Sequence, residues 1–486
     1  MQALSDISLL KRQSFINGEW RTSDRVFDVI NPANNQVVAQ VSDASASDAQ
    51  DAVEAAKQAL PKWSAMPASR RANLLRNWFD LIMQNQDDLG TILTLEQGKP
   101  LAEAKGEVTY GASYVEWFAE EGKRIYGDII APPSQDKRIV VIKQPVGVVA
   151  AITPWNFPNA MITRKAAAAL AAGCTFIVRP ATLTPLSALA LAELAQRAGM
   201  PAGVFNVVVG KDSAGIGKVL TQHPDISKFT FTGSTQVGKT LIRQCASTVK
   251  KVSMELGGNA PFIVFEDADI DAAVQGAIAA KYRNAGQTCV CANRILVDRK
   301  VLSNFTQKFV EEVKKLKVGN GMEANVSIGP MINEGAVIDT QRLVDESVKQ
   351  GATVELDGGP SKGDGSFYHP IVLSNVSNEM AIAQNEIFGP VAPILPFDTE
   401  QEAIGIANST EYGLAAYFYA RDIGRIWRVA EQLDFGMVGI NEGIISNAAA
   451  PFGGVKQSGN GREGSKYGLD DYLEIKYLCM GGLDNK

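Results

Sequence analysis

Histidine and cysteine are scarce in this chain, which limits both metal and disulfide chemistry. The 486 residues contain only two histidines, His223 and His369, and neither lies near a pair of cysteines. Zinc-type ligand spacing is therefore absent, and no metal site is expected. The cysteines are too few and too scattered for a disulfide framework, which predicts a reducing, cytoplasmic location. There are five of them: Cys174, Cys245, Cys289, Cys291 and Cys479.

The chain also lacks a block of one charge and a long apolar run. It carries 47 Lys and Arg against 53 Asp and Glu, and no basic cluster, which argues against nucleic acid as a partner. No run approaches the ~18 apolar residues of a membrane span, and residues 1–15 have no apolar core, so neither insertion nor export is expected. With 45% hydrophobic residues, the chain can bury a large core.

Short β-branched or aromatic runs alternate with helical stretches from about residue 151 onward. This alternation predicts an α/β fold with parallel sheets and ligands beyond the carboxyl ends of the strands. The first series has strands at 175–178, 204–209 and 226–232 and a helix at 187–198. The second series has strands at 262–265 and 294–297 around a helix at 269–284, which indicates a second α/β domain.

The rest of the chain is predicted from its periodicity. The first ~120 residues look mostly helical, with apolar positions three and four apart in 48–62 and 69–86. Two β-rich pieces, 137–144 and 472–478, fall outside both series. A strand at a chain terminus often completes a sheet in a neighbouring subunit, so we expect an oligomer.

The stretch from Asn284 to Cys289 sets one thiol in a glycine-containing loop between a helical run and an apolar run. A thiol inside a regular element stays inert, whereas a loop thiol near oriented amides can ionise and attack an electrophilic carbon. Simple packing is the common alternative for an unpaired cysteine. Other motifs in the sequence are needed to distinguish a catalytic thiol from a packing thiol.

Two glycine-rich motifs suggest nucleotide binding. Residues 233–240 match the phosphate loop of nucleotide triphosphatases and lie between a strand and a helix, so an ATPase or GTPase with Glu266 and Asp267 holding magnesium is one alternative. That alternative leaves Cys289 unexplained, and the same helix start suits a dinucleotide pyrophosphate equally well. Residues 459–464 match the dinucleotide fingerprint, but no strand precedes them, and a tight loop is expected instead.

Six motifs occur in a characteristic order along the chain: Pro154-Trp-Asn-Phe-Pro158, Phe231-Thr-Gly-Ser234, Glu255-Leu-Gly-Gly-Asn259, the loop ending at Cys289, Glu386-Ile-Phe-Gly-Pro390 and Pro451-Phe-Gly-Gly454. Together they resemble the aldehyde dehydrogenase superfamily. The succinate-semialdehyde dehydrogenase group is the most similar, through residues 161–165, 282–284, 289–293 and 443–447. The resemblance covers nearly the whole chain from Asn31 onward.

The resemblance implies three structural parts and a homodimer or homotetramer. A Rossmann-like cofactor domain would span 1–123 and 146–256, an α/β catalytic domain 257–458, and a small β oligomerisation arm 124–145 and 459–486. It also implies the chemistry. Cys289 would add to an aldehyde, Asn156 and the backbone N–H of Cys289 would bind the resulting oxyanion, and Glu255 would activate water to hydrolyse the thioester.

The cofactor implied is NADP or NAD. The family pattern assigns Ile152, Pro154, Trp155, Gly233, Ser234, Glu386 and Phe388 to cofactor binding. The run Arg179-Pro-Ala-Thr182 departs from the usual Lys-Pro-Ala followed by Glu or Ser. Because Thr182 cannot repel a 2′-phosphate and Arg179 can bind one, we expect NADP to be preferred.

The substrate implied is succinic semialdehyde, oxidised to succinate. Arg164, Arg283 and Ser446 match the residues that bind its carboxylate in the succinate-semialdehyde group. Glutaric semialdehyde is an alternative substrate, and a catalytically silent homologue or a coenzyme A-dependent acyl-transferring relative are alternative classes. Cys291, one residue beyond Cys289, suggests a redox switch through a strained disulfide, with plain packing as the alternative.

Overall fold

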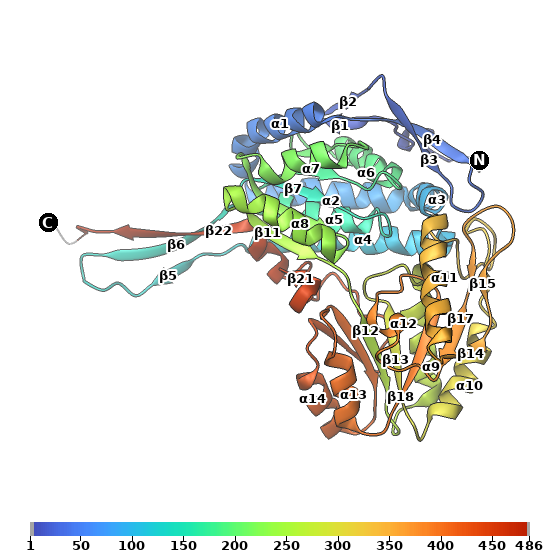
Figure 1. The fold of residues 1–486 in the computed structure, drawn as a ribbon. Coiled ribbons are helices and arrows are strands. Elements are labelled where there is room, and N and C mark those ends of the chain that lie inside the picture. The colour runs from blue at the N-terminus through green and yellow to red at the C-terminus, as the bar shows by residue number, and fades with distance from the viewer. Residues whose placement is uncertain (1–3, 484–486) are drawn as a thin grey trace.

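The computed structural model describes residues 4–483, in which two α/β units lie next to each other and a β ribbon projects from the first (Figure 1). The first unit is built on an eight-stranded sheet with the order β2-β1-β9-β8-β7-β10-β11-β21. Strands β9, β8, β7, β10 and β11 are parallel, and the remaining edge strands are antiparallel. The bounds are β1 Ser14–Ile16, β2 Glu19–Arg21, β7 Val148–Ile152, β8 Thr175–Arg179, β9 Phe205–Val207, β10 Ile226–Thr232, β11 Lys251–Glu255 and β21 Gly459–Asn460.

Helices cover both faces of this sheet, as the strand sequences require. In β7, Val149 and Ala151 pack into one core and Val148 and Ala150 into another, because successive side chains of a strand point to opposite faces. The first core contains residues of α2 Ala68–Gln84, α3 Gln86–Gln97, α4 Leu101–Glu121, α5 Ala160–Ala172 and α6 Leu186–Arg197. The second contains residues of α1 Ala46–Ser64, α7 Ser213–Gln222 and α8 Thr235–Cys245.

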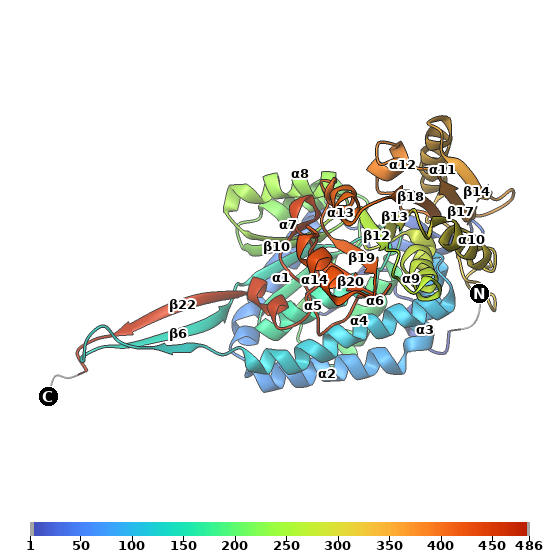
Figure 2. The ribbon, with the colours of Figure 1, turned by 90° about the horizontal axis from the view of Figure 1, so that it is seen from below.

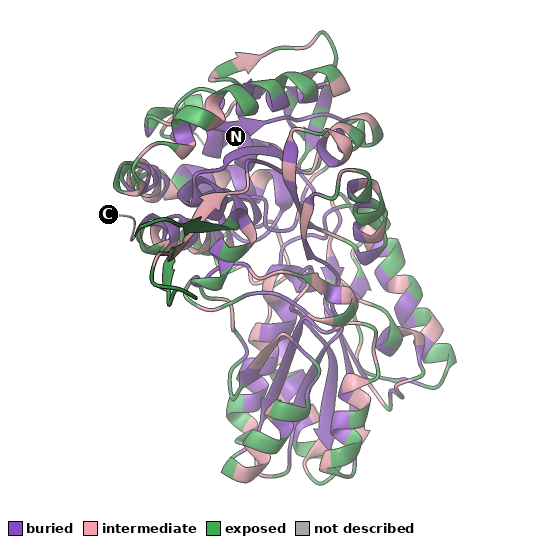
Figure 3. Ribbon diagram, turned by 90° about the vertical axis from the view of Figure 1, so that its left-hand side faces the viewer, coloured by how far each residue is buried: buried purple, intermediate pink, exposed green. Residues whose placement is uncertain are grey.

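The second unit has a seven-stranded sheet with the order β14-β17-β18-β13-β12-β19-β20, parallel except for β14. Its strands are β12 Ala260–Val264, β13 Ala292–Asp298, β14 Thr353–Leu356, β17 Ile371–Ser374, β18 Val391–Phe397, β19 Ala415–Tyr419 and β20 Met437–Ile440. Its helices are α9 Ile270–Tyr282, α10 Leu302–Val313, α11 Glu334–Lys349, α12 Ala381–Gln384, α13 Glu400–Asn408 and α14 Ile423–Gln432. Buried strands run through both units (Figure 3).

The projecting ribbon consists of β5 Asp128–Ile130, β6 Arg138–Pro145 and β22 Leu473–Met480, all antiparallel (Figures 1 and 2). Its apolar side chains are unusually exposed, with Ile129 at 87% and Ile475 at 72%. Two small sheets pair β3 Val26–Ile30 with β4 Val37–Ser42, and β15 Gly359–Pro360 with β16 Tyr368–His369. Short 3-10 helices occupy Ile7–Leu9, Gly122–Arg124, Ala246–Thr248, Arg283–Gly286, Lys456–Ser458 and Tyr467–Tyr472.

The prediction of two α/β units is confirmed, and the expected strand 226–232 is observed as β10. The expectation of a mostly helical N-terminal region is wrong for its first third, where β1 to β4 precede α1. Strands of three residues, such as β1 and β2, carry too little alternation to be distinguished from loops by periodicity. Among the described residues, no helix combines the length and apolar character needed to cross a membrane.

Residues 459–464 form more than a loop. Gly459 and Asn460 make up β21, which pairs with β11 at the edge of the first sheet, opposite Glu255 and Met254. Gly459 has a φ of 121°, and a Cβ there would lie 1.9 Å from the carbonyl oxygen of Met254. The glycines therefore permit close backbone contact, and Glu463 in the same segment contacts Arg164 and Lys165 of α5.

Candidate active site

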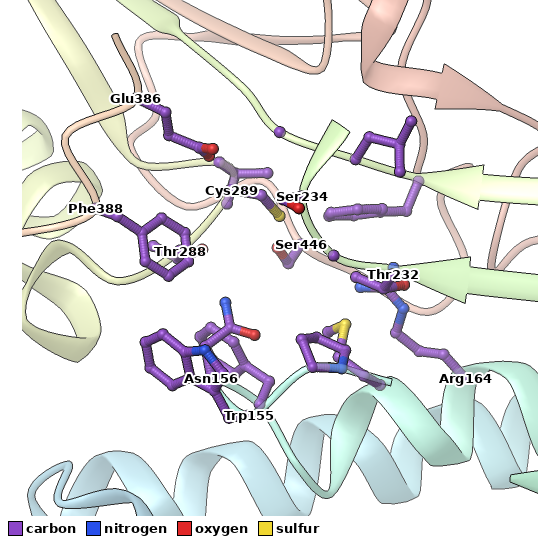
Figure 4. A pocket seen from close by; sticks show the side chains of 18 of the residues that line it. Trp155, Asn156, Arg164, Thr232, Ser234, Thr288, Cys289, Glu386, Phe388 and Ser446 are labelled. Atoms are coloured by element: carbon purple, nitrogen blue, oxygen red, sulfur yellow. The ribbon is translucent and has the colours of Figure 1, made fainter. Parts of the chain in front are cut away.

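One cavity of about 250 Å³ lies where the carboxyl ends of β7, β10 and β11 meet loops of the second unit (Figure 4). It brings together most of the residues singled out from the sequence: Pro154, Trp155, Asn156, Arg164, Gly233, Ser234, Arg283, Cys289, Glu386, Phe388 and Ser446. Much of the remaining wall is apolar or aromatic and was not predicted to belong to the site: Tyr110, Phe157, Met161, Leu256, Val290 and Phe452. All except Tyr110 lie within the segments that carry the family resemblance.

The loop that carries Cys289 has an unusual backbone. Asn284, Ala285 and Gly286 are three consecutive left-handed residues, with φ of 52°, 56° and 77°. Left-handed non-glycine residues cost about 1–3 kcal/mol each and persist only where the surroundings hold them. Gln287 supplies part of that support, because its side chain accepts from the N–H of Ile332 at 2.9 Å and donates to the carbonyl of Asn284 at 3.1 Å. The thiol of Cys289 is thereby directed into the cavity (Figure 4).

The Cys289 thiol is protonated at neutral pH. Burial raises its pKa to about 12, the nearby carboxylate of Glu386 acts in the same direction, and the guanidinium of Arg164 opposes them. The nucleophile is the thiolate. Attack on a carbonyl therefore requires a base that takes the proton or a positive charge brought by a bound ligand.

Asn156 follows β7, is buried, and lies across the cavity from Cys289 (Figure 4). Its Nδ2 donates one hydrogen bond to the carbonyl of Gln287 at 3.1 Å. An amide nitrogen carries two hydrogens, so a second donor is available for an oxygen bound at Cys289. The backbone carbonyl of Asn156 accepts from Lys99 at 2.8 Å and from Asn284 at 3.1 Å.

Glu255 ends β11, behind the cavity wall. It is 2% exposed, and its Oε2 makes no hydrogen bond with any described residue. Burial raises its pKa well above the ordinary value, and the negative charge of Glu463 adds to this effect. Gly453 leaves room for the carboxyl, since a Cβ there would lie 2.9 Å from Oε1 of Glu255. A buried carboxyl with a raised pKa has the properties of a general base that works near neutral pH.

An ionic cluster that sequence reasoning missed lies next to Glu255. Glu463 accepts hydrogen bonds from Arg164 and Lys165, and all three side chains are buried. Burial by itself would raise the pKa of Glu463, but the guanidinium of Arg164 and the ammonium of Lys165 lower it to about 2. Glu463 is thus a permanent anion. The only sequence signal was an acidic residue within a glycine-rich loop.

The two arginines predicted to bind substrate differ in their surroundings. The side chain of Arg164 is 1% exposed and is paired with Glu463. Arg283 is partly exposed, has no ion pair with any described residue, and stacks over the ring of Phe157 at 4.8 Å. Arg283 and Ser446 also line a second, outer cavity of about 570 Å³. Arg283 therefore lies at the junction of the two cavities as a cation without an ion-pair partner among the described residues.

The predicted cofactor residues divide into those that line the cavity and those that lie outside its wall. Gly233 and Ser234 lie between β10 and α8, and Ser234 is the N-cap residue, but its side chain makes no capping hydrogen bond, which leaves backbone N–H groups for an anion. The ring of Phe388 packs edge-on against the ring of Trp155, with 5.6 Å between the ring centres. The backbone of Phe388 is left-handed, with a φ of 50°. Glu386 accepts from the N–H of Gly258 at 3.1 Å, and burial raises its pKa to about 7.

Ile152, Arg179 and Thr182 do not line the cavity. Ile152 and Arg179 are register partners at the carboxyl ends of β7 and β8, on the edge of the sheet where the cavity lies. Arg179 is 7% exposed, and its Nη2 donates to the carbonyl of Gly210 at 2.8 Å and to Oγ of Ser213 at 2.7 Å.

The geometry does not support the triphosphatase alternative. Glu266 and Asp267 follow β12, whereas Gly257, which lines the cavity, precedes that strand. At ~3.3 Å per residue, five strand residues place the two acids roughly 16 Å from the cavity edge. Both carboxylates are also already paired, Glu266 with Lys300 at 2.5 Å and Asp267 with Arg425.

Cys289 and Cys291 are both free thiols. The Sγ of Cys291 lies against the carbonyl oxygens of Lys281 and Ala292, at 3.4 and 3.5 Å, and outside the cavity wall. The redox switch stays a prediction.

A cavity thiol facing a carboxamide, at the carboxyl ends of a dinucleotide-type sheet, is the arrangement expected of an oxidoreductase that uses a cysteine nucleophile. The chain belongs to the aldehyde dehydrogenase family, whose model matches residues 20–478.

Several relatives are similar over their whole length. The NADP(+) succinate-semialdehyde dehydrogenase GabD of Escherichia coli is 56% identical, with 98% of this chain and 99% of that protein covered. Glutarate-semialdehyde dehydrogenase of Pseudomonas aeruginosa is 56% identical (99% and 100% covered), and 3-sulfolactaldehyde dehydrogenase of Pseudomonas putida is 57% identical (100% of both). The crystal structure of succinate-semialdehyde dehydrogenase from Burkholderia pseudomallei has a TM-score of 0.97 at 55% identity, covering 99% of this chain and 100% of that one.

Proposed function

We propose that the protein oxidises succinic semialdehyde to succinate with a nicotinamide cofactor, through a covalent adduct at Cys289. The observation that carries this proposal is a nucleophilic thiol and an unpaired guanidinium, Arg283, in one cavity. The Cys289 thiol first gives its proton to a base or to water, and the thiolate then adds to the aldehyde carbon. The Asn156 amide and the backbone N–H of Cys289 donate hydrogen bonds to the oxygen that becomes negative. A nicotinamide cofactor held near Gly233, Ser234 and Phe388 would supply the hydride acceptor. Glu255 then takes a proton from the water that releases the acid.

The relatives support an aldehyde with a second, anionic end. The substrates in their names carry a carboxylate or a sulfonate remote from the aldehyde, and an arginine binds either group through parallel hydrogen bonds. Glutaric semialdehyde is the second candidate, because a relative of equal identity is named for it.

One assay tests the proposal. Absorbance of the reduced nicotinamide would be followed with succinic semialdehyde, glutaric semialdehyde, 3-sulfolactaldehyde and butanal, with and without coenzyme A. We expect the highest kcat/KM for succinic semialdehyde and no requirement for coenzyme A. A higher value for another anionic aldehyde would reassign the substrate, and equal rates with butanal would contradict an anion-binding pocket.

Arg283→Ala should lower kcat/KM for succinic semialdehyde by roughly 100-fold, because a charge-assisted bond of about 3 kcal/mol is lost. Butanal has no carboxylate, so its kcat/KM should change by less than about threefold. Steady-state kinetics with both aldehydes measures the difference, and Arg342→Ala, an exposed arginine on α11, is the matched control. Equal losses for the two aldehydes would show that Arg283 does not bind the substrate anion.

We propose that NADP is preferred over NAD, with Arg179 and Thr182 next to the 2′-phosphate. Thr182→Glu should lower kcat/KM with NADP by about tenfold or more through charge repulsion, while kcat/KM with NAD stays equal or rises. Thr182→Gln, similar in size but neutral, separates repulsion from bulk. A wild-type preference for NAD, or equal losses with the two cofactors, would contradict this assignment.

We also propose that the protein is a cytoplasmic homodimer or homotetramer that assembles through the arm. The exposed apolar residues of β5 and β22 support this, because a projecting ribbon with unpaired edges is suited to pairing with another chain. The limits proposed are 1–123 with 146–256 for the cofactor domain, 257–458 for the catalytic domain, and 124–145 with 459–486 for the arm.

A further inference from the structure

The turn between α3 and α4 holds a buried polar cluster that lies behind the active-site cavity. Lys99 and Glu107 form an ion pair of 2.6 Å, and each side chain is 1% exposed. Gln97, at the end of α3, is fully buried. None of the three lines the active-site cavity. Glu107 borders the outer cavity, but its side chain is 1% exposed and is paired with Lys99, so direct contact with a substrate does not explain the cluster. Burying an ion pair costs desolvation that its attraction often only just repays, so stability alone is a weak reason for its presence.

Each of the three N–H bonds of the Lys99 ammonium faces a definite partner. Its Nζ donates to Glu107 at 2.6 Å and to the backbone carbonyl of Asn156 at 2.8 Å, and it lies 3.8 Å from the ring centre of Phe157. Lys99 thus binds directly to the residue proposed to supply the oxyanion donor, and to the residue that follows it.

The same turn also binds the cysteine loop. The N–H of Lys99 donates to Oε1 of Gln97 at 3.0 Å, and Nε2 of Gln97 donates to Oδ1 of Asn284 at 3.0 Å. The Nδ2 of Asn284 bridges the carbonyls of Asn156 and Gln287, both at 3.1 Å. The donor and the nucleophile therefore lie on different units but are connected to one buried lysine.

The turn is itself held rigidly. Gly98 has a φ of 97°, and a Cβ there would lie 2.6 Å from Pro330. On the other side, Glu107 accepts from the N–H groups of Asn159 and Ala160 at 2.9 and 3.2 Å, at the start of α5. Lys99 can therefore hold Asn156 in a fixed position relative to the cysteine loop.

We propose that Lys99 is a positioning residue that holds the Asn156 amide against the cysteine loop, so that the oxyanion donor is in place before the carbonyl is attacked. The inference rests on the proposed function, since it concerns the same covalent adduct at Cys289. A preorganised donor contributes to addition at a carbonyl, where oxygen becomes negative, and contributes nothing to displacement at an alkyl halide, where no oxyanion forms.

The test compares these two reactions in Lys99→Met, with Asn156→Ala as the reference. We expect kcat/KM for succinic semialdehyde to fall about 10- to 100-fold, as a donor displaced by a fraction of an ångström predicts. Alkylation of Cys289 by iodoacetamide, followed by mass spectrometry of its peptide, should change less than about threefold. Losses of similar size in both reactions would show a general disturbance of the loop and overturn the inference, as would unchanged turnover.

Because Lys99→Met leaves Glu107 buried without its partner, it could fold poorly. The double variant Lys99→Met/Glu107→Gln removes both charges and keeps the side-chain oxygen that caps α5. We expect its thermal stability to recover while its turnover stays low. Recovery of turnover together with stability would overturn the inference. A wild-type protein that oxidises none of the aldehydes would instead overturn the proposed function, and this inference with it.

Discussion

Cys289→Ala should abolish aldehyde oxidation while the protein stays folded and still binds its cofactor. Loss of the nucleophile in a covalent mechanism typically costs 10⁴-fold or more in kcat, so we expect a loss on the order of 10⁴ or greater. The side chain is partly exposed, lines a cavity and loses only its sulfur atom, so the thermal midpoint should shift by no more than about 2–4 °C. Steady-state kinetics and a thermal melt measure both quantities.

Cys291→Ala is the matched control for that experiment. It removes a thiol two residues away that lies outside the cavity, and we expect it to retain turnover. Oxidation by the Cys289→Ala protein at the wild-type rate would contradict the covalent mechanism, and loss of activity in both variants would indicate damage to the loop.

Glu255→Gln should separate the two halves of the reaction. Without a base, water attacks the thioester slowly, and removal of a general base typically costs about 10²- to 10⁴-fold. We therefore expect steady-state turnover to fall by about 10³-fold while one equivalent of reduced cofactor per active site still forms in a burst. Rapid-mixing absorbance measures the burst, and mass spectrometry should detect the acyl group on Cys289.

The pH dependence provides a second measurement of Glu255. A general base works only when deprotonated, and burial raises the pKa of Glu255 well above 4.5, so wild-type turnover should increase with pH through that raised pKa. Glu255→Gln should lose this increase. Absence of a burst would place Glu255 at activation of the thiol instead, and unchanged turnover would remove it from the mechanism.

Much of the fold and of the site follows from local sequence. The alternation of β-branched and alanine-rich stretches predicted the two parallel sheets, because a strand buried on both faces between helices needs apolar side chains on both of its faces. The order of short motifs indicated Cys289, Asn156, Glu386 and Phe388, and the structure gathers these residues around one cavity. Most of these motifs lie in loops next to strand ends, although distant residues also hold them, as the bonds of Gln287 with Ile332 and of Lys99 with Asn156 show.

Contacts between distant segments became visible only in the folded chain. Glu463 meets Arg164 across 299 positions, and Lys99 meets Asn156 across 57, without any periodic signal that joins them. The two cavity arginines have equivalent side chains in the sequence, yet Arg164 is paired with a buried carboxylate, whereas Arg283 has no ion pair with any described residue. The physical reason is that apolar patterning and turn chemistry act over a few residues, whereas burial and charge pairing depend on which segments the packed sheets bring together.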